Sequence, residues 1–320
     1  MAEPLYLGID IGGTKVLAVA GTSDGQRLGV GTIPTPSQGS ADEVAEALAS
    51  AARAAAQTAG ATLAQVAGVG IASAGAVDMS SGVVVHSPHV ASMRRTPLVA
   101  MLARRLGGAR VVMGNDATLA ALGEQRFGAG RGVDELLFIT ISTGIGGGIV
   151  TRGQLLLGAG GYAGEIGHMS IDAHGPYGKS TMPGAWESLC SGSALARIAG
   201  ERLAAGEAST LAQVQREQGV VDARAVFAAL HAGDGLARRI VDDATHYLGI
   251  GLAGLVNLLN PQRIIIGGGL SNEWDDYIAP AIALMRRHTF GDVGAETEVV
   301  PPALGAGAGA WGAIALAAQG

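Results

Sequence analysis

A glycine-rich turn between two apolar strands occurs twice in this chain. In the first copy, LYLGID and KVLAVAG flank the turn at residues 11–13; in the second, ELLFITI and GIV flank residues 145–147. The two copies lie 134 residues apart, which is far longer than the period of a solenoid repeat. This spacing favours two similar α/β halves that each open with a strand-turn-strand unit and point their glycines at a shared cleft. Two unrelated hairpins are the alternative.

Helices and strands alternate around these two copies. The clearest helix runs from Ser40 to Gly60, because Ser40 and Glu43 have the spacing of a capping box and glycine commonly ends a helix. The chain, with 320 residues, is longer than a single core usually supports, so two lobes are expected. The alternation predicts an α/β fold with mixed sheets covered by helices. Later helices are expected near 192–205, 223–231, 235–259 and 274–287.

Charge, cysteine content and hydropathy argue against several classes of protein. The formal net charge is −6 and no block of Lys or Arg occurs, which argues against nucleic-acid binding. A single cysteine cannot form an internal disulfide and suits a reducing cytoplasm. The N-terminus lacks the regions of a signal peptide. The most apolar stretches, 248–259 and 303–318, are too short or too rich in Ala and Gly to span a membrane, so buried helices are expected there.

Backbone N–H groups in a glycine turn can form a concave anion site, since no Cβ blocks the approach of a ligand. Residues 10–14 (DIGGT) and 142–148 (STGIGGG) both fit this description, and two facing turns could hold the phosphates of one nucleotide. Neither is a Walker A loop. Two GxGxxG matches, at 249–254 and 307–312, are poor dinucleotide sites. The first lies in an expected helix, and only eight residues follow the second.

An Asn-Asp pair joins the strand RVVMG to the helix ATLAALGEQ. Asn115 can cap this helix and Asp116 lies in its first turn, where the helix dipole favours an ionised carboxylate. Such a carboxylate is suited to accept a hydroxyl proton in phosphoryl transfer. The transition state of this reaction is loose, so a weak base is sufficient. A plain capping pair is the alternative.

Two short stretches of the second half concentrate histidine, carboxylate and thiol groups. GYAGEIGHM contains Glu165 and His168, and AWESLCSG contains Glu187 and the single cysteine, Cys190. These side chains are potential metal ligands. The carboxylates and the histidine are also suited to hydrogen-bond the hydroxyls of a sugar. The residue types alone leave both interpretations open.

Six motifs, in their order and spacing, resemble the ROK family of sugar kinases and repressors: DIGGTK, GIASAGAVD, NDATLAALGE, STGIGGGIV, GYAGEIGHM and WESLCSG. The resemblance extends from about Leu5 to Trp311. It implies the two-lobed, ribonuclease H-like fold of the actin-like ATPase superfamily, with a duplicated β-turn-β core. A smaller α/β lobe would comprise residues 1–114 and 304–320. A larger α/β lobe, with the sugar loops and the adenosine side, would comprise residues 115–303.

The resemblance also implies a role for each matching residue. Asp116 would be the catalytic base for the hydroxyl that is phosphorylated, and Asp10 would lie near Mg²⁺ and hold it through water. The expected sugar-binding residues are Asn115, Asp116, Glu165, His168, Glu187 and Gly75. The expected nucleotide-binding residues are Asp10, Gly12, Gly13, Thr14 and Lys15 in the first phosphate turn, Thr143 and Gly144 in the second, and Gly267 and Gly268 on the adenosine side.

The chain departs from the family at a structural zinc site. Many members bind zinc through a His and a Cys-rich segment, but the three matching positions here are Gly178, Ser180 and Ala185. No zinc is therefore expected, and Cys190 is expected to be a small buried apolar residue. The loop before Glu187 must then be held by other means. We expect four side chains to pack it down: Pro176, Tyr177, Pro183 and Trp186.

Two smaller departures lie near the expected sugar side. The family's Pro-Gly after the third strand is Ala74-Gly75 here, and an Asn that is common after the following strand is His89. Both substitutions leave the identity of the sugar open.

The resemblance implies an ATP- and Mg²⁺-dependent kinase that phosphorylates a hexose, with the 6-hydroxyl of glucose as the first expectation. N-acetylmannosamine, mannose, fructose and allose are alternative sugars. A sugar-responsive repressor would need a DNA-binding segment, and only four residues precede Leu5. A non-catalytic sensor would not need Asp116 and two intact phosphate turns, and a polyphosphate donor would need a basic track. The protein is expected to be a cytoplasmic homodimer that binds neither nucleic acid nor membrane.

Overall fold

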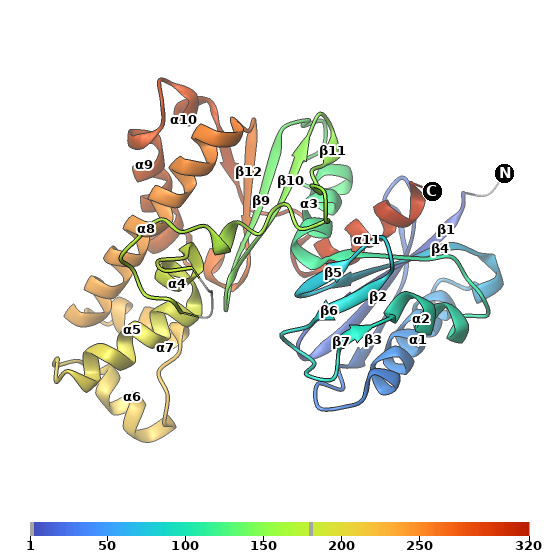
Figure 1. Cartoon of the computed structure of the whole chain (residues 1–320), viewed down its shortest axis with the longest axis horizontal. Helices are drawn as coiled ribbons and strands as arrows, with labels where there is room; N and C mark the ends of the chain where they lie inside the picture. Colours follow the sequence, from blue (N-terminus) through green and yellow to red (C-terminus); the bar gives the residue numbers. More distant parts are fainter. Residues whose placement is uncertain (1–2, 179–181, 320) are drawn as a thin grey trace. The chain divides into compact units, whose positions relative to one another are not determined.

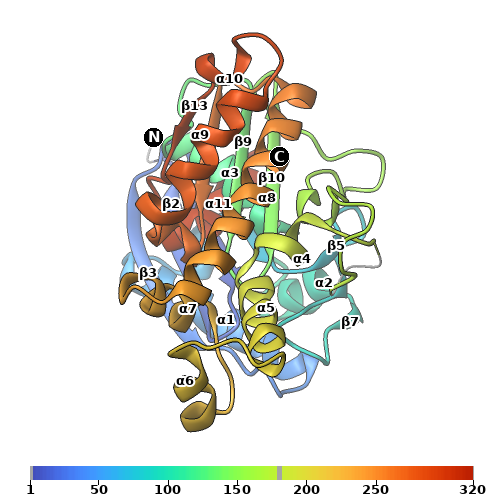
Figure 2. The ribbon, with the colours of Figure 1, turned by 90° about the vertical axis from the view of Figure 1, so that its left-hand side faces the viewer.

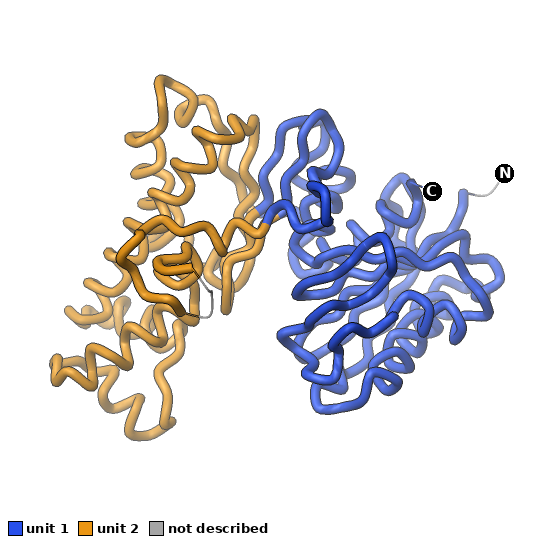
Figure 3. Tube along the Cα trace, in the orientation of Figure 1, with its two compact units in different colours: residues 1–138, 148–164, 302–320 blue, residues 139–147, 165–301 orange. Residues whose placement is uncertain are grey.

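The computed structural model describes residues 3–178 and 182–319, which form two compact units (Figure 3). The boundary differs from the lobe boundary expected at residue 115. The helix that begins at Asp116 groups with the first unit, because it packs against the C-terminal helix. Unit 1 comprises Met1–Phe138, Gly148–Gly164 and Pro302–Gly320, and unit 2 comprises Ile139–Gly147 and Glu165–Pro301.

The core of unit 1 is a five-stranded mixed sheet (Figure 1). Its strands are β1 (Leu5–Ile11), β2 (Lys15–Thr22), β3 (Arg27–Pro34), β4 (Val66–Ser73) and β8 (Val111–Asn115). The strand order is β3-β2-β1-β4-β8. β2 runs antiparallel to β1, as the strand-turn-strand motif predicts, whereas β4 runs parallel to β1 and β8 runs parallel to β4. Parallel neighbours need crossover connections, which helices provide here.

Four helices cover this sheet: α1 (Ala41–Thr58), α2 (Leu98–Arg105), α3 (Asp116–Phe127) and α11 (Ala308–Ala318). Alternate residues of β1 point to opposite faces. Leu7 and Ile9 join the apolar core with α1 and α2, whereas Gly8 faces α11. A Cβ on Gly8 would collide with the carbonyl oxygen of Ala310. The glycine therefore allows α11 to approach the sheet closely.

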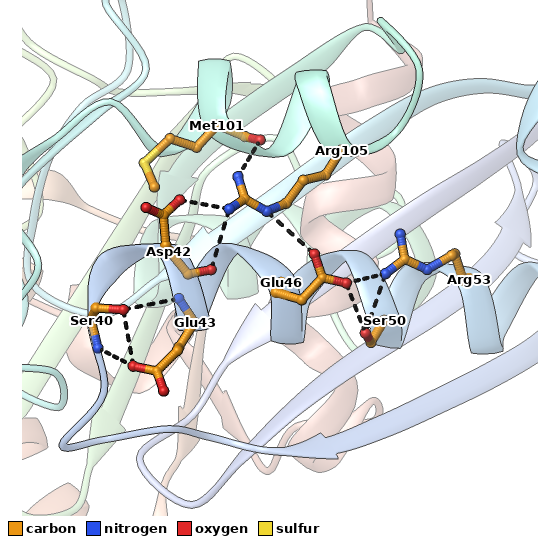
Figure 4. A network of polar contacts seen from close by, with 8 residues as sticks. All are labelled: Ser40, Asp42, Glu43, Glu46, Ser50, Arg53, Met101 and Arg105. Carbon is orange, nitrogen blue, oxygen red and sulfur yellow. Dashed lines mark hydrogen bonds and ion pairs between the residues drawn. The ribbon is translucent and has the colours of Figure 1, made fainter.

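The N-terminus of α1 has the capping box that the sequence predicts (Figure 4). The N–H of Glu43 donates to Ser40 Oγ (3.3 Å), and the N–H of Ser40 donates to the Glu43 carboxylate (2.7 Å). Arg105 of α2 contacts Asp42 (2.6 Å) and Glu46 (3.4 Å) of α1. Because exposed ion pairs contribute only about 0–1 kcal/mol, apolar packing on the sheet holds these helices in place.

A small three-stranded sheet follows β4, and the sequence did not predict it. Its strands are β5 (Ala76–Asp78), β6 (Val83–His86) and β7 (Arg94–Thr96), in that order. Each strand is too short for a clear alternation of apolar and polar residues. The segment between β6 and β7 lines a pocket that is described below.

A second five-stranded sheet has the order β11-β10-β9-β12-β13. Its strands are β9 (Leu136–Ile141), β10 (Ile145–Thr151), β11 (Gln154–Leu155), β12 (Arg263–Gly267) and β13 (Glu298–Val300). The division between the two units falls within β9 and β10. β9 and β10 repeat the arrangement of β1 and β2, as the sequence predicts. The turn that joins them lies at residues 142–144, however, and residues 145–147 belong to β10.

Helices make up most of unit 2. The long helix α8 (Gly235–Leu259) lies beside α9 (Ala279–His288) (Figures 1 and 2). Gly251 of α8 faces Trp186 so closely that a Cβ would collide with the indole. Gly249 and Gly251 of the GxGxxG match thus allow close packing, as expected, whereas a Cβ on Gly254 would meet nothing within 4 Å. The other helices of unit 2 are α4 (Trp186–Cys190), α5 (Gly192–Ala204), α6 (Leu211–Gln218), α7 (Ala223–His231) and α10 (Val293–Glu296).

Short helical turns complete the chain. The 3₁₀ turns are η1 (Leu63–Gln65), η2 (Ile166–His168), η3 (Gly269–Asn272) and η5 (Gly305–Gly307), and η4 (Trp274–Ile278) is a π-helical turn. In the part of the chain that the structure describes, no helix combines the length and the apolar character needed to cross a membrane.

Candidate active site

Asn115 and Asp116 stand at the junction of β8 and α3. Asn115 caps α3 as predicted, because its Oδ1 accepts hydrogen bonds from the N–H groups of Ala117 (2.9 Å) and Thr118 (3.1 Å). Its Nδ2 donates to the carbonyl oxygen of Gly75 (3.1 Å). The cap therefore fixes the start of α3, where Asp116 lies, and ties it to the loop after β4.

Asp10 belongs to β1, and its carboxylate lies beside the start of α11 and near enough to Asp116 for the two charges to interact. A Cβ on Gly309 would be 2.8 Å from Asp10 Oδ2, so this glycine leaves room for the carboxylate. Burial, and then the negative charge of Asp116, raises the pKa of Asp10 to about 7, while Lys15 opposes this shift. Burial also raises the pKa of Asp116. Two neighbouring carboxylates repel each other when both are ionised, which favours a cation beside them.

The first expected phosphate turn, between β1 and β2, is closed by a hydrogen bond from the N–H of Gly12 to the carbonyl oxygen of Lys15 (3.0 Å). The carbonyl oxygen of Thr14 accepts a bond from the loop after β3. Gly13 faces His89, whose Nδ1 would lie 3.4 Å from a Cβ at position 13. Positive charge on His89 lowers the pKa of Asp116, against the effect of burial. His89 is therefore close to both the turn and the candidate base.

A pocket of about 350 Å³ opens beside His89. Hydroxyl, amide, imidazole and guanidinium groups line it, and none of its lining side chains is acidic. It therefore suits a ligand that offers hydrogen-bond acceptors. No sequence pattern indicates this pocket, because its walls come from two loops far apart in the chain. The lining residues are Ser37, Gln38, His86, Ser87, Pro88, His89, Ala91 and Arg94.

The second phosphate turn, between β9 and β10, is bound to the start of α5. The N–H of Gly192 donates to the carbonyl oxygen of Ser142 (2.8 Å), and the N–H of Ser193 donates to that of Thr143 (3.1 Å). Within the turn, the N–H of Ser142 donates to the carbonyl oxygen of Gly144 (2.9 Å). The shape of this turn thus depends on α5.

Glu187 of α4 reaches the same turn. Its Oε2 accepts a long hydrogen bond from the N–H of Ile145 (3.4 Å). A Cβ on Gly144 would lie only 2.7 Å from that oxygen. The carboxylate therefore occupies space that a side chain at position 144 would otherwise fill.

Glu165 precedes η2 and His168 is its last residue, close to the second turn. His168 Nε2 lies 3.8 Å from Glu165 Oε2, and about half of each side chain is exposed, 51% for His168 and 46% for Glu165. Gly167 packs so tightly on the carbonyl oxygen of Ile145 that a Cβ would collide with it. The structure thus brings Glu165, His168 and Glu187 to the start of β10, where a ligand could reach the exposed pair.

The segment that presents Glu187 is anchored by Trp186. This side chain is fully buried (0% exposed), and its Nε1 donates to the carbonyl oxygen of Tyr247 (3.0 Å). The N–H of Trp186 donates to the carbonyl oxygen of Met169 (2.8 Å). The expectation that Trp186 packs this loop down is therefore confirmed.

The expectation that Pro176 and Tyr177 also pack the loop down is wrong. Pro176 is exposed and Tyr177 is 63% exposed. Main-chain acceptors hold this segment instead: the carbonyl oxygen of Pro176 accepts from the N–H of Gly184 (2.8 Å), and that of Pro183 accepts from Ser170 Oγ (2.6 Å). These hydrogen bonds hold the backbone of the segment while the rings of Pro176 and Tyr177 stay exposed. Ser180, one of the positions that match zinc ligands in the family, lies outside the described residues.

The expected adenosine side lies at the end of β12. Gly267 is the last residue of that strand, and Gly268 has a φ of 90°. A Cβ on Gly268 would collide with the backbone of Ile141. Position 268 therefore requires glycine for both its conformation and its close contact.

Among residues 3–178 and 182–319, no cluster of three His, Cys, Asp or Glu side chains could hold a metal ion. Cys190 is fully buried, as expected, and burial raises the pKa of its thiol. The thiol is therefore a poor metal ligand and a poor nucleophile.

The chain is similar in sequence to one family of known proteins along nearly its whole length. The sequence model described as the ROK family matches residues 6–320. A glucokinase from Halalkalibacterium halodurans is 34% identical over 284 residues, 88% of this chain and 84% of the relative. An N-acetylmannosamine kinase from Escherichia fergusonii is 33% identical over 268 residues, 82% of each protein.

A solved structure supports the fold assignment. The crystal structure of a ROK family glucokinase from Streptomyces griseus in complex with glucose and AMPPNP is 34% identical. It matches with a TM-score of 0.79 over 99% of this chain and 100% of that chain. The expected α/β fold of the actin-like ATPases is thereby confirmed. With its family motifs in order along nearly the whole sequence, the chain belongs to the ROK family.

Proposed function

We infer that this protein transfers the γ-phosphoryl group of ATP to a hydroxyl of a hexose, with glucose as the preferred acceptor. The relative named glucokinase and the structural neighbour with glucose and AMPPNP support this activity. Within this chain, the observation that carries the proposal is the carboxylate of Asp116, positioned by the Asn115 cap at the start of α3.

Asp116 would act as the general base. Its ionised carboxylate accepts the proton of the sugar's 6-hydroxyl while the hydroxyl oxygen attacks the γ-phosphorus. A new P–O bond forms, the bond from the γ-phosphorus to the bridging oxygen breaks, and ADP leaves. The raised pKa of Asp116 makes its carboxylate a better proton acceptor than an ordinary one.

Mg²⁺ fits the oxygen donors near Asp10. This ion prefers carboxylate and phosphate oxygens and keeps several waters, and a cation would relieve the repulsion between Asp10 and Asp116 that helps raise the pKa of Asp10. Asp10 would hold the ion through water. When bound, Mg²⁺ supplies positive charge that stabilises the phosphate oxygens during transfer.

The residues of unit 2 would bind the two substrates. Glu165, His168 and Glu187 would hydrogen-bond sugar hydroxyls, and the amides of the turn at Thr143 and Gly144 would bind phosphate oxygens. Gly267 and Gly268 would border the adenosine. In unit 1, the sugar contacts would be Asn115 and Gly75, and the first phosphate turn would comprise Gly12, Gly13, Thr14 and Lys15.

N-acetylmannosamine is the second candidate acceptor. The related N-acetylmannosamine kinase supports it, and so does the pocket beside His89, whose donors could bind the carbonyl oxygen of an acetamido group. Dimerisation and a cytoplasmic location remain predictions from the sequence.

The test is a sugar panel with ATP and Mg²⁺, with ADP release measured for each sugar and the product position determined by ³¹P and ¹³C NMR. We expect glucose to give glucose 6-phosphate and 6-deoxyglucose, which lacks the acceptor hydroxyl, to give no product. A higher kcat/KM for N-acetylmannosamine than for glucose would favour the second candidate. No sugar-dependent ADP release with any member of the panel would contradict the proposal.

A further inference from the structure

The carboxylate of Glu187 lies where a phosphate would be expected. Its Oε2 accepts from the N–H of Ile145 (3.4 Å) and fills the space above Gly144. The amides of this turn are the donors that the proposed function assigns to ATP. A carboxylate and a phosphate oxygen are both acceptors, so they compete for the same N–H groups.

The scaffold around this contact is well anchored. Trp186, next to Glu187, is fully buried and bonded through its indole to Tyr247. On the other side, the N–H groups of Gly192 and Ser193 hold the turn by its carbonyl oxygens. The side chain of Glu187 can therefore change rotamer while the turn and the backbone of α4 keep their positions.

Charge adds to this competition. An ionised carboxylate at the turn repels the phosphates of a nucleotide, and the repulsion is stronger in a partly desolvated place than in water. Glu187 is also one of the side chains proposed to accept hydrogen bonds from a sugar. A bound sugar offers hydroxyl donors that can draw the carboxylate away from the Ile145 amide.

We propose that Glu187 restrains nucleotide binding at the second phosphate turn until a sugar engages its carboxylate. The inference rests on the proposed function and adds a coupling between the two substrates. Sugar then tightens nucleotide binding, and the nucleotide tightens sugar binding by the same factor, because linkage is reciprocal. Without sugar, the turn binds ATP weakly, which limits wasteful hydrolysis.

The test measures the Kd of Mg²⁺-AMPPNP by calorimetry, with and without saturating glucose. In the wild type, glucose should lower this Kd by about 5–150-fold, the usual range of allosteric coupling. Glu187→Gln removes the charge, so its sugar-free Kd should fall about 5-fold or more and its coupling factor should shrink. Glu187→Asp retracts the carboxylate by one methylene and should also bind nucleotide more tightly without sugar.

The matched control is Glu217→Gln, which removes one negative charge from an exposed position of α6. Its sugar-free Kd should equal that of the wild type. If Glu187→Gln and Glu187→Asp bind nucleotide no more tightly than the wild type, while glucose-dependent phosphorylation by the wild type is intact, the inference is overturned and the proposed function stands. If the wild type binds no nucleotide with or without glucose, both are overturned.

Discussion

The candidate residues of unit 1 and those of unit 2 are positioned in different ways. Asp10 and Asp116 lie at the ends of regular elements, a central strand and a capped helix. Glu165 precedes a single 3₁₀ turn that ends at His168, and Glu187 lies in a five-residue helix. A group that must accept a proton gains from a fixed position. Side chains that recognise a ligand can be adjustable, and we propose that Glu187 is one of them.

The largest expected effect lies in unit 1. Asp116→Asn removes the proton acceptor but keeps the size of the side chain, so kcat should fall by about 10²–10⁴-fold. The Kd of glucose should change much less, because the amide still hydrogen-bonds. Steady-state kinetics and calorimetry on the same preparation measure both. A variant with near wild-type kcat would contradict the role of Asp116 as base.

In unit 2, the largest expected effect is on stability. Trp186→Ala opens a cavity under α4 and should lower the free energy of unfolding by about 3–5 kcal/mol, measured by denaturant titration. Tyr177→Ala is the matched control from the same segment. Since Tyr177 is 63% exposed, its removal should change stability by less than about 0.5 kcal/mol. Equal losses for the two variants would contradict the account of how Glu187 is supported.

The raised pKa of Asp10 should make the stability of the protein depend on pH. Its pKa in the folded protein is about 7, against an ordinary value of 3.8, so the folded state retains a proton that the unfolded state has lost. Stability from this group is present below about pH 4 and is lost as the pH rises to about 7, an effect on the order of a few kcal/mol.

Melting temperatures across this range test the prediction. Asp10→Asn should flatten this part of the pH profile. Mg²⁺ at pH 7 should raise the melting temperature of the wild type more than that of Asp10→Asn. An identical pH profile for the two proteins would show that Asp10 is not responsible.

The smallest expected effect concerns the cap of α3. Asn115→Ala removes the acceptor of two backbone N–H groups and the donor to Gly75, and should cost about 0.5–2 kcal/mol of stability. Asn115→Ser keeps a capping oxygen and should recover most of this loss. If the alanine variant is as stable as the wild type, the cap does not hold the start of α3.

The same contrast explains what sequence could predict. The capping box at Ser40, the cap at Asn115 and the duplicated glycine turn are local patterns, and the structure contains all three. The pocket at His89 and the contact of Glu187 with Ile145 join segments far apart in the chain. The exposure of Tyr177 depends on the hydrogen bonds that its loop makes with distant parts of the backbone. No local sequence pattern predicts these bonds.

The central claim is that the protein is a sugar kinase that uses ATP. Its most direct test is the rate of ADP formation from ATP and Mg²⁺ in the presence and absence of glucose, with glucose 6-phosphate measured in the same reaction. We predict ADP formation that depends on glucose, with one glucose 6-phosphate formed for each ADP. ADP formation that is independent of glucose, or its absence under both conditions, would contradict the claim.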